Sequence, residues 1–104
     1  MKCDYHSNIN VQMNYWHAES TNLAECHEPL FVYLEKQQHA WTRYASQLDA
    51  WGWTLKTENN PFGVSGWKWH RPANAWYCMH LWQHYTYHPD NEYLERVYPM
   101  MKSA

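Results

Sequence analysis

Residues 26–48 read CHEPLFVYLEKQQHAWTRYASQL and carry the longest periodic pattern of the chain. Large or apolar side chains recur in this stretch at steps of three and four residues, at Cys26, Leu30, Leu34, Gln37, Trp41, Tyr44 and Leu48. Such steps place side chains on one face of an α-helix. Pro29 has no backbone N–H, so it must lie in the first turn or kink the helix. The stretch therefore predicts a long helix with one buried face.

Three further stretches predict helices around this one. Residues 10–16 contain no helix breaker and predict a short helix or the end of a longer element. Pro72 suits the first turn of a helix over residues 73–87, which is apolar or aromatic nearly all round and should be buried on both sides. Pro89 should end that helix, and Asp90 should cap a last helix. The residues expected to point inward from the last helix are Tyr93, Leu94, Val97 and Met100 or Met101.

The segment between the second and third of these helices shows no period. Glycine and proline concentrate in residues 52–72, and the run Asn59-Asn60-Pro61-Phe62-Gly63 has turn chemistry. We find no alternating strand pattern of useful length, so a long aromatic-rich loop is expected there. The predicted fold class is all-α.

Composition limits the classes of function. A chain of 104 residues forms at most one domain. Its net charge of −2 leaves no basic surface for a phosphate backbone, and no stretch is apolar enough for a membrane helix, so neither nucleic acid nor membrane is expected as a partner. Eight Trp, nine Tyr and two Phe are far above ordinary usage. Two interpretations remain open, an aromatic-rich core or a ligand surface, with carbohydrate as the first candidate ligand.

The spacing of the cysteines and histidines indicates neither a cofactor nor a metal site. Cys3, Cys26 and Cys78 form no CxxC pair and no disulfide framework, so we expect buried free thiols. His80 and His84 have the i, i+4 spacing of two metal ligands on one helix face, but no His-Glu-x-x-His pattern accompanies them. We therefore predict no metal site.

Residues 4–16, DYHSNINVQMNYW, interleave polar amides with aromatic and apolar side chains. Side-chain amides donate and accept hydrogen bonds in a fixed geometry, and aromatic rings cover the apolar C–H face of a pyranose. The alternative for Asn8 and Asn10 is an N-cap or turn role, which asparagine also favours. This stretch is the first candidate for a sugar site.

Several stretches together resemble the catalytic domain of glycoside hydrolase family 95, the α-L-fucosidases and α-L-galactosidases. They are residues 8–16 (NINVQMNYW), 18–19 (AE), 21–31 (TNLAECHEPLF), 52–53 (GW), 60–63 (NPFG), 75–77 (AWY), 80–85 (HLWQHY), 90 (D) and 92–94 (EYL). His17 departs from the family pattern, which usually has proline before Ala-Glu. The resemblance implies that residues 1–104 are an N-terminal portion of an (α/α)6 toroid, with the remainder of the catalytic domain missing.

The resemblance also implies site residues. In the family two asparagines and an aspartate hold and activate the attacking water, and a glutamic acid protonates the leaving oxygen with inversion of the anomeric centre. The asparagine pair falls on Asn8 and Asn10, which are the expected catalytic residues, and a substrate-contacting histidine falls on His6. We find no equivalent of the acid or the aspartate before Ala104. The expected partner is an oligosaccharide with terminal α-L-fucose or L-galactose, and a secreted or periplasmic location fits the family without being decided by these residues.

The other candidate substrate-binding residues are Trp67 and Trp69 in the aromatic loop and Trp76 in the helix that follows it. Trp67 and Trp69 are expected to be exposed platforms, one of which stacks on the glycan, whereas core packing is the alternative for Trp76. Were the chain a hydrolase by itself, its acidic candidates would be Glu19, Glu25, Glu28 and Glu58. Two other classes stay open: a carbohydrate-binding module that releases no sugar, and a small helical interaction protein that binds none.

Overall fold

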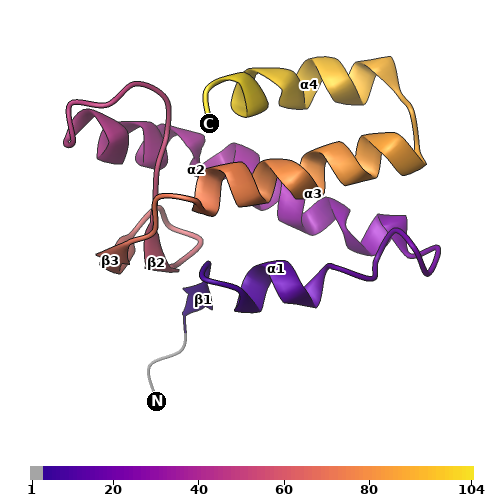
Figure 1. Ribbon diagram of the computed structural model, residues 1–104, viewed down its shortest axis with the longest axis horizontal. Helices are drawn as coiled ribbons and strands as arrows, with labels where there is room; N and C mark the ends of the chain where they lie inside the picture. Colours follow the sequence, from indigo (N-terminus) through magenta and orange to yellow (C-terminus); the bar gives the residue numbers. More distant parts are fainter. Residues whose placement is uncertain (1–3) are drawn as a thin grey trace.

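The structure is a computed structural model that describes residues 4–104, and it places four α-helices beside a small sheet (Figure 1). Helix α3 lies between α1 and α4 in this view, α2 crosses behind it, and the strands gather at one end. The elements are β1 (Tyr5–His6), α1 (Asn10–Asn14), the 3-10 turn η1 (Ala24–Cys26), α2 (Glu28–Ser46), β2 (Lys56–Asn59), β3 (Ser65–Trp69), α3 (Ala73–Tyr87) and α4 (Asn91–Lys102).

The long helix is confirmed as α2. It begins at Glu28 with Pro29 in its first turn, where the missing N–H disrupts no helical hydrogen bond. Its buried face is Leu30, Phe31, Leu34, Gln37, Trp41 and Ala45. Leu48 lies beyond the helix end and is exposed, as is Cys26 in η1. The predicted stripe was therefore right along the helix and wrong at both of its ends.

Helices α3 and α4 begin at the residues that the sequence predicted. Pro72 is the N-cap of α3, and the Asp90 carboxylate accepts a hydrogen bond from the backbone N–H of Glu92 at the start of α4. Tyr93, Val97 and Met100 are buried as predicted. The prediction that α3 is buried on both sides was wrong, because only one of its faces packs on the core. Met79 and Trp82, on the other face, are 68% and 50% exposed.

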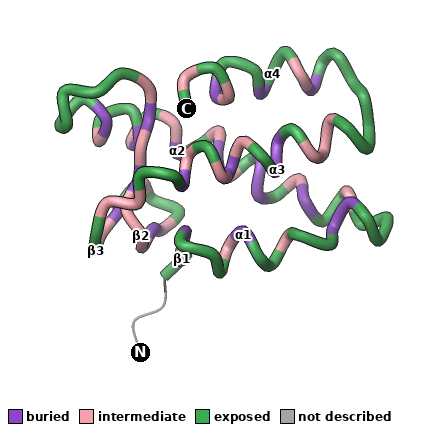
Figure 2. The backbone as a smooth tube through the Cα atoms, in the orientation of Figure 1, coloured by how far each residue is buried: buried purple, intermediate pink, exposed green. Residues whose placement is uncertain are grey.

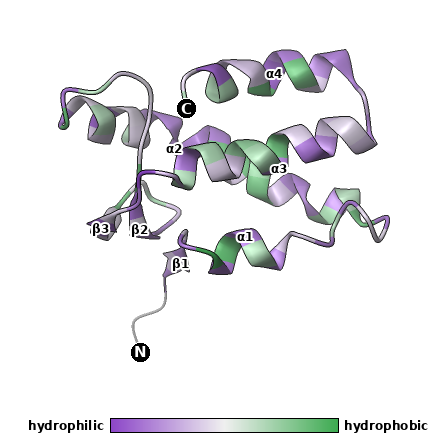
Figure 3. Cartoon of the chain, viewed as in Figure 1, coloured by the Kyte–Doolittle hydropathy of each residue, from purple (hydrophilic) through white to green (hydrophobic). Residues whose placement is uncertain are grey.

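The all-α prediction is wrong, because part of the presumed loop forms an antiparallel sheet in the order β1-β2-β3. Asn60 closes the hairpin between β2 and β3: its side-chain oxygen accepts from the N–H groups of Phe62 and Val64, and Gly63 takes a φ of 88°. The strands read KTEN and SGWKW, which Figure 3 shows as mainly hydrophilic, so no apolar alternation marks them. An (α/α)6 toroid is not what the described residues form.

The β3 strand contains an irregularity that exposes an indole. The register with β2 shifts between Lys56 and Glu58, opposite the part of β3 where Trp67 takes a φ of 67°. This left-handed conformation is uncommon for a residue other than glycine and is typical of a β-bulge. The Trp67 side chain is 72% exposed.

The core is aromatic at its centre. The Trp41 ring stacks on Trp53 at a centroid distance of 5.4 Å and on Tyr77 at 6.2 Å, and all three side chains are buried. The Trp53 indole N–H donates to the Met100 carbonyl at 2.9 Å, so the indole contributes apolar area and leaves no buried donor unpaired. Buried positions recur along α2 and α3, whereas the turn between α3 and α4 is exposed (Figure 2). Part of the aromatic excess is thus core packing.

The cysteines differ from expectation in part. Cys26 is exposed, and Cys78 is half-buried, with burial raising the pKa of its thiol to about 11. Cys3 lies outside the described residues. Among residues 4–104, no helix is both long and apolar enough to cross a bilayer.

Candidate active site

A tightly held turn joins β1 to α1 and carries the two asparagines. Ser7 sits at its centre and is fully buried. The Ser7 N–H donates to the Thr57 carbonyl at 2.7 Å, and the Ser7 carbonyl accepts from the Gln12 amide at 2.6 Å. The Ser7 hydroxyl bonds the Tyr77 hydroxyl at 2.7 Å and accepts from the Asn59 amide at 2.9 Å. Strand β2 and helices α1 and α3 thereby fix one residue of the turn.

The asparagine side chains themselves are free. Asn8 and Asn10 are exposed, and within residues 4–104 neither side-chain amide makes a hydrogen bond to the protein. The N-cap of α1 is Ile9, which offers no polar side chain, so the capping interpretation finds no support at these positions. Both amides remain available to an external partner.

Ile9 between them has a strained backbone. Its φ is 148° with ψ at −37°, a region that β-branched residues avoid. Such conformations persist only where surrounding contacts enforce them, and they cluster at functional sites. The hydrogen bonds of Ser7 on one side and of helix α1 on the other provide that enforcement, so the turn presents Asn8 and Asn10 on a rigid support.

Removal of the Ser7 hydroxyl tests this support. In Ser7→Ala the Tyr77 hydroxyl and the Asn59 amide lose a buried partner, which should lower the free energy of unfolding by about 1–3 kcal/mol. Urea unfolding of the chain measures the change. Ser20→Ala, which removes an exposed hydroxyl, is the control and should stay within about 0.5 kcal/mol of wild type. Equal stabilities for the two variants would show that Ser7 does not anchor the turn.

His6 precedes this turn and lies beside two carboxylates. It pairs across the sheet with Glu58, and ring nitrogen and carboxylate oxygens of His6, Glu58 and Asp4 lie within 4.8 Å of one another. His6 is half-buried, so one side of its ring remains accessible. Among the four acidic candidates, Glu58 is therefore the one that the structure brings next to a predicted site residue. Nothing in the sequence pattern paired it with His6.

The three tryptophans are not gathered at one place. Strand β2 separates β3 from β1, so Trp67 and Trp69 lie two strand spacings, about 10 Å, from the strand that carries His6. Trp67 is exposed as predicted, but Trp69 is half-buried between the Tyr44 ring and the Lys56 ammonium group. Trp76, on α3, faces a different hollow.

A second buried polar cluster joins the Ala18-Glu19 turn to α2 and α3. Glu19 Oε1 accepts from His27 Nδ1 at 2.9 Å and from His84 Nδ1 at 2.5 Å, and the Glu19 side chain is fully buried. His27 Nε2 lies 3.0 Å from His80 Nδ1. Sequence spacing could not reveal this cluster, because Glu19 and His27 are eight positions apart and His27 and His80 are 53 positions apart.

Electrostatics fix the protonation of this cluster near neutral pH. Burial would raise the pKa of Glu19, but the hydrogen bonds from His27 and His84 outweigh it and hold that pKa below its ordinary value. Burial lowers the pKa of His27 despite the neighbouring carboxylate. Burial, with a smaller effect of His27, also lowers the pKa of His80 to about 4. Glu19 is therefore ionised, and His27 and His80 are neutral.

Glu19, His27 and His84 also have the donor types of a metal site. Two ligands of one tetrahedral zinc ion, each at about 2.0–2.1 Å, lie about 3.3 Å apart. The observed separations of 2.9 and 2.5 Å are those of hydrogen bonds instead. His80 and His84, whose spacing is that of two metal ligands, bond different partners, since His80 bonds His27 and His84 bonds Glu19.

Comparison with known proteins relates the chain to one family. A profile of the glycosyl hydrolase family 95 catalytic domain matches residues 1–104. The chain is 36% identical to the probable alpha-fucosidase A of Aspergillus niger over 97% of its own length, and 36% identical to the alpha-L-fucosidase 2 of Arabidopsis thaliana over 95%. It spans only 14% and 13% of the lengths of these two relatives. The resemblance drawn from the motifs is thus confirmed: the chain belongs to glycosyl hydrolase family 95 and corresponds to part of its catalytic domain.

Proposed function

We propose that this chain is an N-terminal portion of an inverting α-L-fucosidase-type catalytic domain, and that Asn8 and Asn10 position the attacking water. The proposal rests on the side-chain amides of Asn8 and Asn10, which are exposed and make no hydrogen bond within residues 4–104. They lie on a turn that the hydrogen bonds of Ser7 hold in place and whose backbone is strained at Ile9. Family membership supplies the reaction class, and the names of the relatives supply the sugar. Terminal α-L-fucose is the proposed leaving sugar, with L-galactose as the related substrate.

The proposed chemistry assigns separate roles to amides and carboxylates. Inverting hydrolysis needs an acid and a base on opposite faces of the sugar, about 6.5–9.5 Å apart, with a water molecule between base and anomeric carbon. An asparagine amide cannot take the proton of that water, but it can orient the water's lone pair toward the anomeric carbon. A carboxylate then removes the proton, while a carboxylic acid protonates the leaving oxygen. We assign the acid and base to other parts of the complete domain.

The proposed sugar contacts lie around the same turn. His6 is placed to bond a sugar hydroxyl, because its ring is half-accessible and precedes Asn8 by two residues. Trp67 offers an exposed indole on the far edge of the sheet, where it would meet a more distant unit of the glycan rather than the sugar held by His6. Trp69 is the weaker platform, because Tyr44 and Lys56 already cover its ring.

The stereochemistry of the first product tests the proposal. The complete catalytic domain, incubated with 4-nitrophenyl α-L-fucoside, should release β-L-fucose first, which proton NMR distinguishes from the α-anomer before mutarotation. Release of the α-anomer would mean retention and would remove the water-positioning role of the amides. Binding of fucose without any release would instead favour a carbohydrate-binding module.

A further inference from the structure

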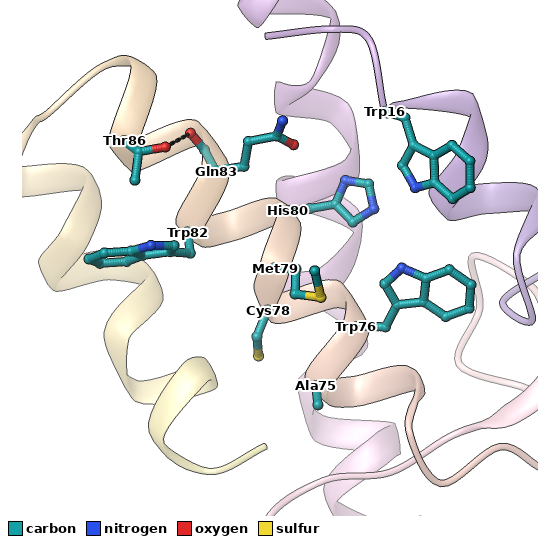
Figure 4. A pocket seen from close by; sticks show the side chains of 9 residues that line it. All are labelled: Trp16, Ala75, Trp76, Cys78, Met79, His80, Trp82, Gln83 and Thr86. Atoms are coloured by element: carbon teal, nitrogen blue, oxygen red, sulfur yellow. Dashed lines mark hydrogen bonds between the residues drawn. The ribbon is translucent and has the colours of Figure 1, made fainter. Parts of the chain in front are cut away.

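A hollow of about 610 Å3 lies along α3 (Figure 4). Its walls are Trp16, Ala75, Trp76, Cys78, Met79, His80, Trp82, Gln83 and Thr86. The His80 ring projects from α3 toward the side on which Trp16 and Trp76 stand, and all three side chains line the hollow. Trp16 is 48% exposed. Neither Asn8 nor Asn10 lines this hollow.

The buried cluster sets the orientation of His80. The ionised Glu19 can only accept, so His27 Nδ1 carries the proton of that hydrogen bond. Neutral His27 then has a lone pair on Nε2, and His80 Nδ1 must be the donor to it. Neutral His80 is left with a lone pair on Nε2. This nitrogen makes no hydrogen bond within residues 4–104, and it is not among the fully buried polar atoms. The chain Glu19–His27–His80 thus holds one acceptor at the wall of the hollow.

We propose that this hollow is a second sugar subsite, in which His80 Nε2 accepts a hydrogen bond from a pyranose hydroxyl while Trp16 and Trp76 cover the C–H face of the ring. The choice of L-fucose-type sugars rests on the proposed function. Glu19 and His27 act as positioning residues, since they fix the tautomer of His80 without touching the ligand. The Gln83 amide, which makes no side-chain hydrogen bond within residues 4–104, offers a further polar contact on the same wall.

The chemistry of the walls favours a sugar over a purely apolar ligand. Two indoles alone would accept any flat apolar molecule, but such a ligand would cover the His80 acceptor without giving it a hydrogen bond, which is unfavourable. A sugar hydroxyl satisfies that acceptor, and the apolar face of the same ring covers the indoles. Helix α1 connects the subsite to the turn that carries Asn8 and Asn10, because Asn10 begins this helix and Trp16 lies two residues beyond its end.

The experiment titrates the chain with L-fucose, following indole fluorescence and the 15N chemical shifts of the histidine rings. Wild type should show saturable binding and a change at His80 Nε2. In His80→Asn the amide N–H keeps the donor to His27, but the amide oxygen lies nearer the backbone than Nε2 does and no longer reaches the sugar hydroxyl, which should weaken L-fucose binding about tenfold. His39→Asn, an exposed histidine on α2, is the matched control. Trp16→Ala should weaken binding to a similar degree, whereas Trp51→Ala, with a 79% exposed indole outside the hollow, should not.

The outcomes separate this subsite from the proposed function. Absence of saturable L-fucose binding by wild type, or equal affinities for His80→Asn and His39→Asn, overturns the subsite. Identical responses to glycerol would do so too, because glycerol has hydroxyls but no pyranose face. Asn10→Ala should retain the binding seen at His80 even though it removes turnover in the complete domain. If the complete domain releases β-L-fucose while the hollow binds nothing, the subsite alone fails.

Discussion

In Asn10→Ala, the complete catalytic domain should lose roughly 10²–10³-fold in kcat, the loss seen when one preorganised polar group at a reacting centre is removed. The Asn10 amide is exposed and bonds nothing within residues 4–104, so the substitution removes no internal contact. If Asn10 acts only on the water, KM for an α-L-fucoside should change little, because the ground-state contacts of the sugar remain. Steady-state kinetics with 4-nitrophenyl α-L-fucoside measures both parameters.

Asn14→Ala is the matched control for this loss. Asn14 is also an exposed asparagine, and it ends the same helix that Asn10 begins. Its replacement should leave kcat unchanged. A loss of kcat in Asn10→Ala alone would then be due to the place of the Asn10 amide, and not to a change in the stability of helix α1. Turnover at the wild-type level in Asn10→Ala would remove Asn10 from the mechanism.

Trp41→Ala should have the largest effect on stability, about 3–5 kcal/mol in the free energy of unfolding. The side chain is fully buried and packs face to face on Trp53 and Tyr77 and edge to face on Tyr33. Its removal leaves a cavity that these rigid rings cannot fill. Domains of this size have about 5–15 kcal/mol in total, so the variant should be marginal.

Chemical unfolding followed by near-ultraviolet circular dichroism measures this change, since the stacked rings dominate that signal. Trp51→Ala is the control, because that indole is 79% exposed, and it should stay within about 0.5 kcal/mol of wild type. A loss below about 1 kcal/mol in Trp41→Ala would mean that the core repacks around the gap.

The helices were predictable because local signals and tertiary packing agree. Pro29, Pro72 and Asp90 act within a few residues of their own position, and the period of α2 reports a single buried face. The sheet was missed for the opposite reason. Its strands are held by pairing over long separations, such as His6 with Glu58, and by the Asn60 turn rather than by an apolar alternation. Pairing of this kind leaves no periodic trace in the sequence.

The sequence says less about the candidate site, whose residues stay a proposal. Asn8, Asn10 and His6 came from a family motif, and the structure adds that Ser7 holds their turn through Tyr77 and Asn59. The Glu19–His27–His80 chain could not be foreseen, because each partner comes from a different element. The three predicted tryptophans were chosen for their nearness in sequence, and the sheet and α3 disperse them.

Strand β3 forms one edge of the described sheet, and the bulge at Trp67 interrupts its backbone there. A regular edge strand exposes a row of N–H and C=O groups on which another polypeptide can assemble. In β3 the left-handed residue interrupts that row after two positions, and the exposed Lys68 places a charge beside the break. The strand can thus display a bare indole to the medium without offering its backbone as a template for fibrous growth.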